Sequence, residues 1–167
     1  MIRSALETDA NVLWELANEA HRESRYHKYP MDYPTVNRLL QASVAQPKHY
    51  CLKVAEQEGK IVGFIVGFCV GAWFNLGGPR FAHDLMLYVQ PAKRSTTAPL
   101  HLVRAFETWA TAEAGADEVW LATTTGVKPE QTGQFYDRLG FSRVGSIHVK
   151  NAQDVRKPQH TSPVQPA

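Results

Sequence analysis

The stretch "LYVQPAKRSTTAPLHLVRAFETWA" at residues 87–110 joins a predicted strand to a predicted helix through a turn of cations and hydroxyls. Apolar residues recur at helical spacing from Leu102 to Trp109, which gives the helix one wide apolar face. The amides at a helix start carry partial positive charge and point outwards, and here Lys93 and Arg94 add full charges. The turn is therefore either an anion site or a simple helix cap.

Outward from this turn, the pattern of apolar residues predicts a sheet with helices. The run at 60–74 is nearly continuous in apolar residues, as expected for a central strand covered on both faces. Strands are predicted at 2–6, 50–57, 60–74, 81–90, 118–125 and 141–150. Helices are predicted after Thr8 or Asp9, from Pro34, after the turn and at 130–141. Hairpins come first and helix crossovers later, so we expect an α/β fold with a mixed sheet and helices on both faces.

The composition limits the class of protein. A chain of 167 residues is long enough for one domain, which we place at 1–150, before a polar, proline-punctuated tail at 151–167 that we expect to be mobile. The formal net charge of +2 argues against a nucleic-acid binder, which usually has a clustered basic face. No apolar stretch reaches the roughly 18 residues of a membrane helix, and the first residues lack the apolar core of a signal peptide. We therefore expect a soluble, cytoplasmic protein with no membrane partner and two buried thiols.

A second motif extends the pattern. "GQFYDRLGFSRVG" at 133–145 predicts a short helix that ends at Leu-Gly-Phe and leads into a strand. Together with 87–110 and "VWLATTT" at 119–125, it resembles the GNAT acetyltransferase superfamily, whose members move an acetyl group from acetyl-coenzyme A to an amine. The resemblance covers roughly residues 2–150. It implies a mostly antiparallel, twisted sheet of six to seven strands flanked by about four helices.

The resemblance also implies where coenzyme A (CoA) would lie. In this family, the end of a strand presents main-chain groups to the pantetheine arm, and the following turn holds the diphosphate. The positions that match the strand end are Leu87, Tyr88 and Val89. The positions that match the turn are Lys93, Arg94, Ser95, Thr96, Thr97 and Ala98.

The turn departs from the glycine-rich pattern of the family. Thr97 and Pro99 stand where glycines usually let the backbone come close to the diphosphate. Pro99 also removes one amide donor, although proline suits the first position of a helix. The departure leaves an alternative open, in which a protein of this fold has lost turnover and acts as a binding or structural component.

Acyl transfer to an amine needs a base for the amine and an acid for the departing thiolate. Tyr136 matches the family tyrosine that often protonates the sulfur, and a phenol is a donor at neutral pH. His83 and Asp84 are both candidates for the base, and the sequence does not rank them. Regular alternation along the strand predicts that His83 shares a face with Leu87 and Val89, and that Asp84 lies on the other face.

The acceptor is expected opposite the cofactor, between the loop after the first helix and the later strands. Aromatic residues there favour an apolar or planar acceptor, and a carboxylate favours a cation. The candidate acceptor contacts are Tyr26, Tyr29, Asp32, Trp73 and Phe74. We expect a small-molecule, peptide or protein amine as acceptor and acetyl-CoA as the only cofactor. His21, His27 and His49 do not share a metal-ligand spacing with acidic or cysteine partners, so we expect no metal. A homodimer is compatible with the resemblance, since many family members pair through strands or helices.

Overall fold

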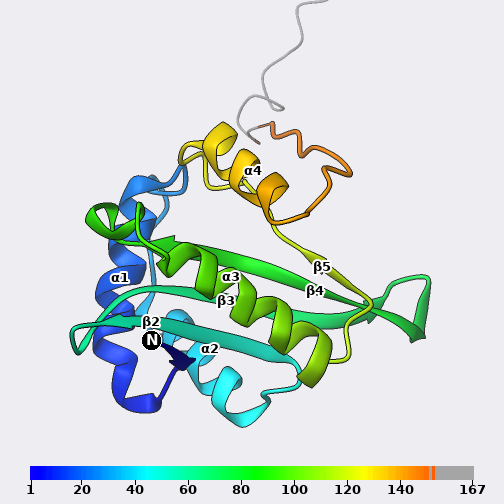
Figure 1. The fold of residues 1–167 in the computed structure, drawn as a ribbon, viewed down its shortest axis with the longest axis horizontal. Helices are drawn as coiled ribbons and strands as arrows, with labels where there is room; N and C mark the ends of the chain where they lie inside the picture. The colour runs from blue at the N-terminus through cyan, green and yellow to red at the C-terminus, as the bar shows by residue number, and fades with distance from the viewer. Residues whose placement is uncertain (151, 153–167) are drawn as a thin grey trace, which may run out of the picture.

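The computed structural model describes residues 1–150 and 152, and it contains one five-stranded sheet with the strands in chain order (Figure 1). The strands are β1 (Ile2–Ser4), β2 (Tyr50–Gln57), β3 (Lys60–Ala72), β4 (Asn75–Val89) and β5 (Glu118–Trp120). The first four strands pair antiparallel, and β5 pairs parallel to β4. The predicted mixed, mostly antiparallel sheet is therefore confirmed.

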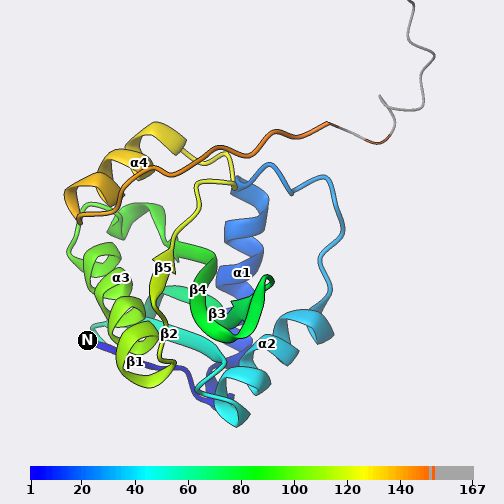
Figure 2. The same cartoon turned by 90° about the vertical axis from the view of Figure 1, so that its right-hand side faces the viewer.

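Helices cover both faces of this sheet (Figure 2). The helices are α1 (Ala10–Glu23), α2 (Tyr33–Ala45), α3 (Ala98–Thr108) and α4 (Pro129–Arg138). One buried cluster joins the sheet to α3 and contains Ile65, Leu102 and Phe106, which are all fully buried. A second cluster joins the opposite face to α1 and α2 and contains Leu16 and Leu40. Both cysteines are buried free thiols, as predicted.

The prediction of six to seven strands is wrong for the described residues, which form five strands. The expected strand at 141–150 is extended but pairs with no other strand in the described part of the chain. Its apolar side chains stay in solvent, with Val144 90% exposed and Ile147 71% exposed. The neighbouring edge strand β5 has only three residues, not the eight predicted, and so offers a short ladder. The predicted mobile tail at 151–167 lies, apart from residue 152, outside the described residues.

A β-bulge interrupts β4 beside the end of its pairing with β5. Val66 pairs with Met86 and the next residue, Gly67, pairs with Asp84, so Leu85 is an extra residue in β4. The bulge reverses the phase of the strand. Ala82 and Val89 therefore contact the cluster under α3, whereas Tyr88 contacts the cluster under α1 and α2. The predicted regular alternation of β4 is wrong, because it places Ala82 and Val89 on opposite faces.

Gly67, opposite the bulge, has no room for a side chain. A Cβ atom there would collide with the carbonyl oxygen of His83 and lie 2.7 Å from Cε2 of Phe106. We expect Gly67→Ala to lower the free energy of unfolding by roughly 1–3 kcal/mol, the usual cost of overpacking a core. Urea denaturation measures the change. Gly77→Ala is the matched control, since a Cβ at Gly77 meets nothing within 4 Å; equal stability of the two variants would contradict the prediction.

Candidate active site

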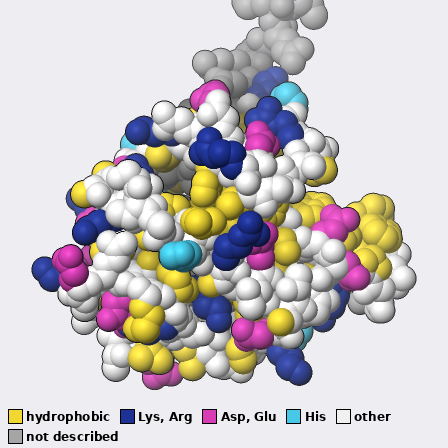
Figure 3. Space-filling view, in the orientation of Figure 1, with side chains coloured by type: hydrophobic (Ala, Val, Ile, Leu, Met, Phe, Trp, Pro, Cys, Tyr) yellow, Lys and Arg dark blue, Asp and Glu magenta, His cyan; other side chains and the backbone are white. Residues whose placement is uncertain are grey.

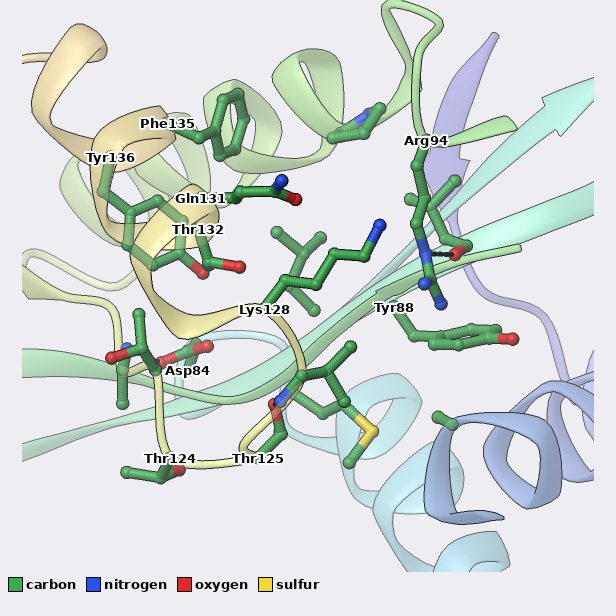
Figure 4. A pocket seen from close by; sticks show the side chains of 18 of the residues that line it. Asp84, Tyr88, Arg94, Thr124, Thr125, Lys128, Gln131, Thr132, Phe135 and Tyr136 are labelled. Carbon is green, nitrogen blue, oxygen red and sulfur yellow. Dashed lines mark hydrogen bonds between the residues drawn. The ribbon is translucent and has the colours of Figure 1, made fainter. Parts of the chain in front are cut away.

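The first cavity lies where β4 and β5 separate. The two strands pair only at Phe81–His83 against Glu118–Trp120, and beyond this point β4 continues to Val89 paired with β3 but not with β5. The cavity has a volume of about 410 Å³ and is walled by β4, the 122–125 segment, the start of α3 and one side of α4 (Figure 4). A bent strand that leaves its neighbour exposes main-chain groups that would otherwise be paired. The split therefore forms a slot with polar backbone on one wall.

Asp84 and Tyr136 face each other across this slot (Figure 4). The Oδ1 atom of Asp84 accepts a hydrogen bond of 2.8 Å from the amide of Ala122, which fixes the carboxylate at the split. Burial raises the pKa of Asp84 to about 7, and the hydrogen bond from Ala122 offsets only part of this effect. Burial, and then the charge of Asp84, raise the pKa of Tyr136 above its ordinary value. Near neutral pH the pair thus combines a carboxyl that can take a proton with a phenol that keeps one.

His83 lies outside both cavities described here. Its ring stacks on Phe68 at 5.3 Å between centroids and meets Trp120 edge-on at 4.7 Å. Burial lowers its pKa, so the ring is mostly neutral at pH 7. The structure therefore brings Asp84, but not His83, next to Tyr136.

Arg94 is held by the protein itself at the mouth of the first cavity. Its Nε donates a hydrogen bond of 2.8 Å to the carbonyl oxygen of Val89 (Figure 4). Its Nη2 forms an ion pair of 2.6 Å with Glu23 of α1. The guanidinium also lies over the ring of Tyr88, 5.5 Å from the centroid. An anion arriving here would compete with the Glu23 carboxylate for Arg94.

The turn before α3 is partly satisfied by its own side chains. The Oγ1 of Thr96 accepts 3.2 Å from the amide of Ala98, and Pro99 has no amide to offer. Within the described residues, no protein partner is found for the amides of Ser95, Thr97 and Leu100. Thr97 is the residue before α3 and its side chain does not cap the helix. The turn thus keeps fewer free amides than a glycine-rich loop would.

Two carboxylates that the sequence analysis did not single out lie beside the hydroxyl of Tyr88. The hydroxyl of Tyr88 donates to Glu19 at 3.1 Å and to Glu23 at 3.0 Å. Burial, and then these two carboxylates, raise the pKa of Tyr88 above its ordinary value. Glu19 and Glu23 are four residues apart on α1, which puts them on one helix face, but only the fold shows that this face meets β4.

Lys128 is another side chain that the sequence did not single out. It precedes α4 with a left-handed backbone (φ 44°, ψ 55°), which is uncommon for a residue other than glycine. Figure 4 shows its side chain extending into the first cavity from the start of α4. Strained backbone often marks functional positions. The signal in the sequence was the Gly-Val-Lys-Pro loop, in which proline disfavours an ordinary helical lysine.

A second cavity of about 290 Å³ lies between α1, α2 and the sheet. Leu85 and Met86 line both cavities, so the two meet at the bulge beside Asp84. Among the predicted acceptor contacts, Tyr26 lines this second cavity.

The other four predicted acceptor contacts lie elsewhere. Asp32 caps α2, because its Oδ2 accepts from the amide of Thr35 at 2.9 Å and from its hydroxyl at 2.6 Å. Tyr29 is 55% exposed and lines neither cavity. The rings of Trp73 and Phe74 meet edge-on at the projecting tip of the β3–β4 hairpin, where Figure 3 shows hydrophobic side chains gathered. The sequence predicted that the next strand begins at residue 81, but β4 begins at Asn75, so the longer hairpin carries both rings away from the cavities.

The described residues contain no group of three or more metal-ligating side chains. Within the same residues, none of the helices has the length and apolar character that crossing a bilayer demands.

Comparison with known proteins places this geometry in a family. The model of the GNAT acetyltransferase family matches residues 11–141. No curated protein matches the chain in sequence. Similar solved structures include glucosamine-6-phosphate N-acetyltransferase from Arabidopsis thaliana, with a TM-score of 0.69, 16% identity, and coverage of 90% of this chain and 96% of that chain.

Two further structures are similar over the same share of this chain, 90%. Ribosomal-protein-alanine N-acetyltransferase from Brucella melitensis biovar Abortus 2308 has a TM-score of 0.67, 17% identity and 99% of its own chain covered. AAC(6')-Iy in complex with a CoA-S-monomethyl-acetylneamine bisubstrate analogue has a TM-score of 0.68, 18% identity and 96% of its own chain covered. The structures share the fold, and the family model spans most of the sequence. The chain therefore belongs to the GNAT acetyltransferase family.

Proposed function

We propose that this protein is an N-acetyltransferase that moves the acetyl group of acetyl-CoA directly to an amine. The observation that carries the proposal is the slot between β4 and β5, in which Asp84 and Tyr136 face each other. When bound, acetyl-CoA would supply the thioester whose carbonyl carbon the amine attacks. The chain's own residues would manage the two protons of this exchange.

Asp84 is the proposed proton acceptor. An alkyl ammonium has an ordinary pKa near 10.4, so the acceptor amine must lose a proton before it can attack. A carboxyl with a pKa of about 7 is a far better base near neutral pH than one with the usual pKa near 3.8. The hydrogen bond from Ala122 leaves the second oxygen of Asp84 available for this proton.

Tyr136 is the proposed proton donor for the departing thiolate. Its hydroxyl stays protonated at neutral pH, because burial and the charge of Asp84 both raise its pKa. Direct transfer, without an enzyme thiol, is supported by the positions of the cysteines. Cys51 and Cys69 line neither cavity, and burial raises the pKa of Cys51 to about 12, where little thiolate forms.

The residues that line the first cavity support binding of acetyl-CoA. The β4 main chain at Leu87, Tyr88 and Val89 would meet the pantetheine arm. Three cations line the cavity for the phosphates, namely Arg94, Lys128 and Arg138. The free amides of Ser95 and Thr97 would add donors at the turn, whereas Lys93 is half-buried beside it. The amide of Ala98 is already bonded to the Thr96 hydroxyl, and Pro99 has no N–H, so two amides of this turn are not available to bind the diphosphate.

Calorimetry with acetyl-CoA, followed by an assay of thiol release with a panel of amines, tests the proposal. We expect micromolar binding of acetyl-CoA and release of CoA only when an amine is present. No binding at millimolar acetyl-CoA would reject it. Binding without turnover on any amine would favour the second candidate, a GNAT-fold protein that binds and does not acetylate. The observations behind that candidate are the capped turn and the Arg94–Glu23 ion pair.

The Arg94–Glu23 pair gives a prediction on affinity. We expect Arg94→Ala to weaken acetyl-CoA binding about tenfold at low salt and less at high salt, because a charged contact is removed. We expect Glu23→Gln to tighten binding a few-fold, because it releases Arg94 from its carboxylate partner. Arg104→Ala is the matched control, since Arg104 pairs with Glu107 on α3 and lines neither cavity. If all three variants bind acetyl-CoA like the parent protein, the turn is a cap only.

A further inference from the structure

The second cavity is built almost wholly from hydrocarbon. Leu13 and Ala17 of α1, Val36 and Leu39 of α2, and the sheet residue Phe64 surround it. Among the described residues that line it, none is Asp, Glu, Lys or Arg. A wall of this kind stabilises a ligand by removing apolar surface from water and offers a charged group no partner.

The polar side chains on this wall are those of His21, Ser24, Tyr26, Tyr33 and Asn37, and that of Ser24 is satisfied within the protein. The hydroxyl of Ser24 donates 2.9 Å to the carbonyl oxygen of His21 and accepts 3.1 Å from the amide of Tyr26. The carboxylates of the neighbourhood lie elsewhere, with Glu19 and Glu23 bonded to Tyr88 on the first cavity's side. A polyamine or a polyhydroxylated sugar would therefore lose more hydration in this cavity than these few polar groups could replace.

The volume sets the size of the ligand. An engineered apolar cavity of about 150 Å³ holds one benzene ring. The second cavity, at about 290 Å³, is large enough for an apolar group of roughly two rings. Tyr33, which lines it, meets Trp14 edge-on at 5.2 Å between centroids, and Tyr26 adds another ring. Flat aromatic walls favour a flat aromatic ligand.

The position of the cavity sets where the ligand's amine would lie. Leu85 and Met86 form the boundary with the first cavity, and Asp84 is the next residue along β4. A ligand with its apolar part between α1 and α2 would need only a short linker to bring an amine to this boundary. Desolvation by the apolar wall would also lower the pKa of the ammonium, which eases loss of its proton.

We propose that the acceptor is a primary amine on a short linker from an apolar aromatic group, bound with that group in the second cavity. The inference rests on the proposed function for its chemistry, while the binding of the aromatic group can be measured separately. In the reaction, the ammonium first loses a proton through Asp84 to solvent, the neutral amine nitrogen then bonds to the acetyl carbon, and the carbon–sulfur bond breaks. Asp84 takes the second proton from the nitrogen, Tyr136 gives its proton to the sulfur, and the proton on Asp84 passes to the Tyr136 oxygen, which restores both groups. The products are the aromatic acetamide and CoA.

Tryptamine, ethanolamine and spermidine are the probes for this proposal, with acetyl-CoA as donor. We expect kcat/KM for tryptamine to exceed that for either polar amine by at least about tenfold, the scale on which apolar pockets discriminate. Equal or lower kcat/KM for tryptamine would overturn the proposal while leaving acetyl transfer intact. Tryptamine binding to the protein without cofactor, measured by calorimetry, is the second readout; no binding at millimolar tryptamine would also overturn it, whether or not acetyl-CoA binds.

A filled cavity should abolish this preference. Val36→Phe places a ring in the second cavity, and Val44→Phe is the matched control, because Val44 lies on the same helix, is 45% exposed and lines neither cavity. We expect Val36→Phe to weaken tryptamine binding at least about tenfold and Val44→Phe to leave it unchanged. Circular dichroism checks that both variants fold, and Ala17→Phe fills the same cavity from α1 if Val36→Phe does not. Unchanged tryptamine binding in a folded, filled variant would place the aromatic group elsewhere and overturn the proposal.

Discussion

Replacing Asp84 by Asn should lower kcat/KM for acetyl transfer by about 1,000-fold, within the range that general acid–base catalysis contributes. The substitution keeps the size of the side chain and its oxygen, so the amide of Ala122 retains an acceptor. What it removes is the ability to take a proton from the acceptor amine. Measurement needs only steady-state thiol release at saturating acetyl-CoA with a reactive amine.

The pH dependence identifies the group. Only deprotonated Asp84 can accept a proton, so kcat/KM of the parent protein should rise with pH and level off above an apparent pKa near 7. For Asp84→Asn, kcat/KM should stay at its low residual value and should not rise with pH in this range. A parent profile that is flat between pH 5.5 and 8, or a variant that retains the rise, would assign the base to another group.

Stability should change in the opposite direction to activity. Because the pKa of Asp84 is raised in the folded state, the folded protein binds this proton more tightly than the unfolded chain. This proton contributes on the order of 4 kcal/mol to the free energy of unfolding. The contribution is fully present below about pH 4 and is lost as the pH rises through about 7. Asp84→Asn should therefore unfold at a higher urea concentration than the parent protein at pH 8. A variant that is both less active and less stable would point to misfolding instead.

Replacing Tyr136 by Phe should lower turnover about 100-fold while leaving the affinity for acetyl-CoA nearly unchanged. Tyr136 is 6% exposed, and the centroid of its ring lies 6.0 Å from that of Phe141. Phenylalanine should therefore keep the packing and lose only the hydroxyl. Loss of that donor leaves the departing thiolate without a proton. Calorimetry and steady-state kinetics on the same preparation separate the two effects.

A matched control for this variant is Tyr29→Phe, which removes the hydroxyl of an exposed tyrosine that lines neither cavity. The control should match the parent protein in turnover and affinity. Acyl donors with better leaving groups give a second check, because Tyr136 acts on the leaving thiolate. Turnover of a thioester of a more acidic thiol should fall less in Tyr136→Phe. Equal turnover of Tyr136→Phe and the parent protein would make Tyr136 a packing residue.

Much of the fold follows from patterns that act locally. The helix at α3 was visible because its apolar face and its start are encoded within a few turns. The hairpin of β2 and β3 was visible for the same reason, with Gly59 at a positive φ of 72° in the turn. The prediction of a strand at 141–150 was wrong because a strand needs a neighbouring strand to pair with as well as an alternating sequence. The adjacent β5 has only three residues and offers few main-chain groups for pairing.

The site was harder to predict than the fold. Asp84 and His83 are neighbours in sequence and equally plausible as bases, and only the surroundings of each side chain distinguish them. The aromatic residues at 73 and 74 looked suitable for a pocket, but the length of the hairpin carries them away from it. The walls of the second cavity come from α1, α2, the loop between them and the strands β2, β3 and β4, and no local pattern in the sequence indicates that these elements enclose a space. Composition predicts which residues are apolar and not which of them leave space between them.

The extra residue in β4 means that the proposed catalytic geometry depends on the length of a strand as well as on its residues. Without Leu85, positions 82, 84, 87 and 89 would alternate regularly with 83, 86 and 88, so a chain one residue shorter would have an uninterrupted ladder. Comparisons between homologous sequences that score substitutions but ignore single-residue gaps would therefore overlook the position on which the proposed site depends.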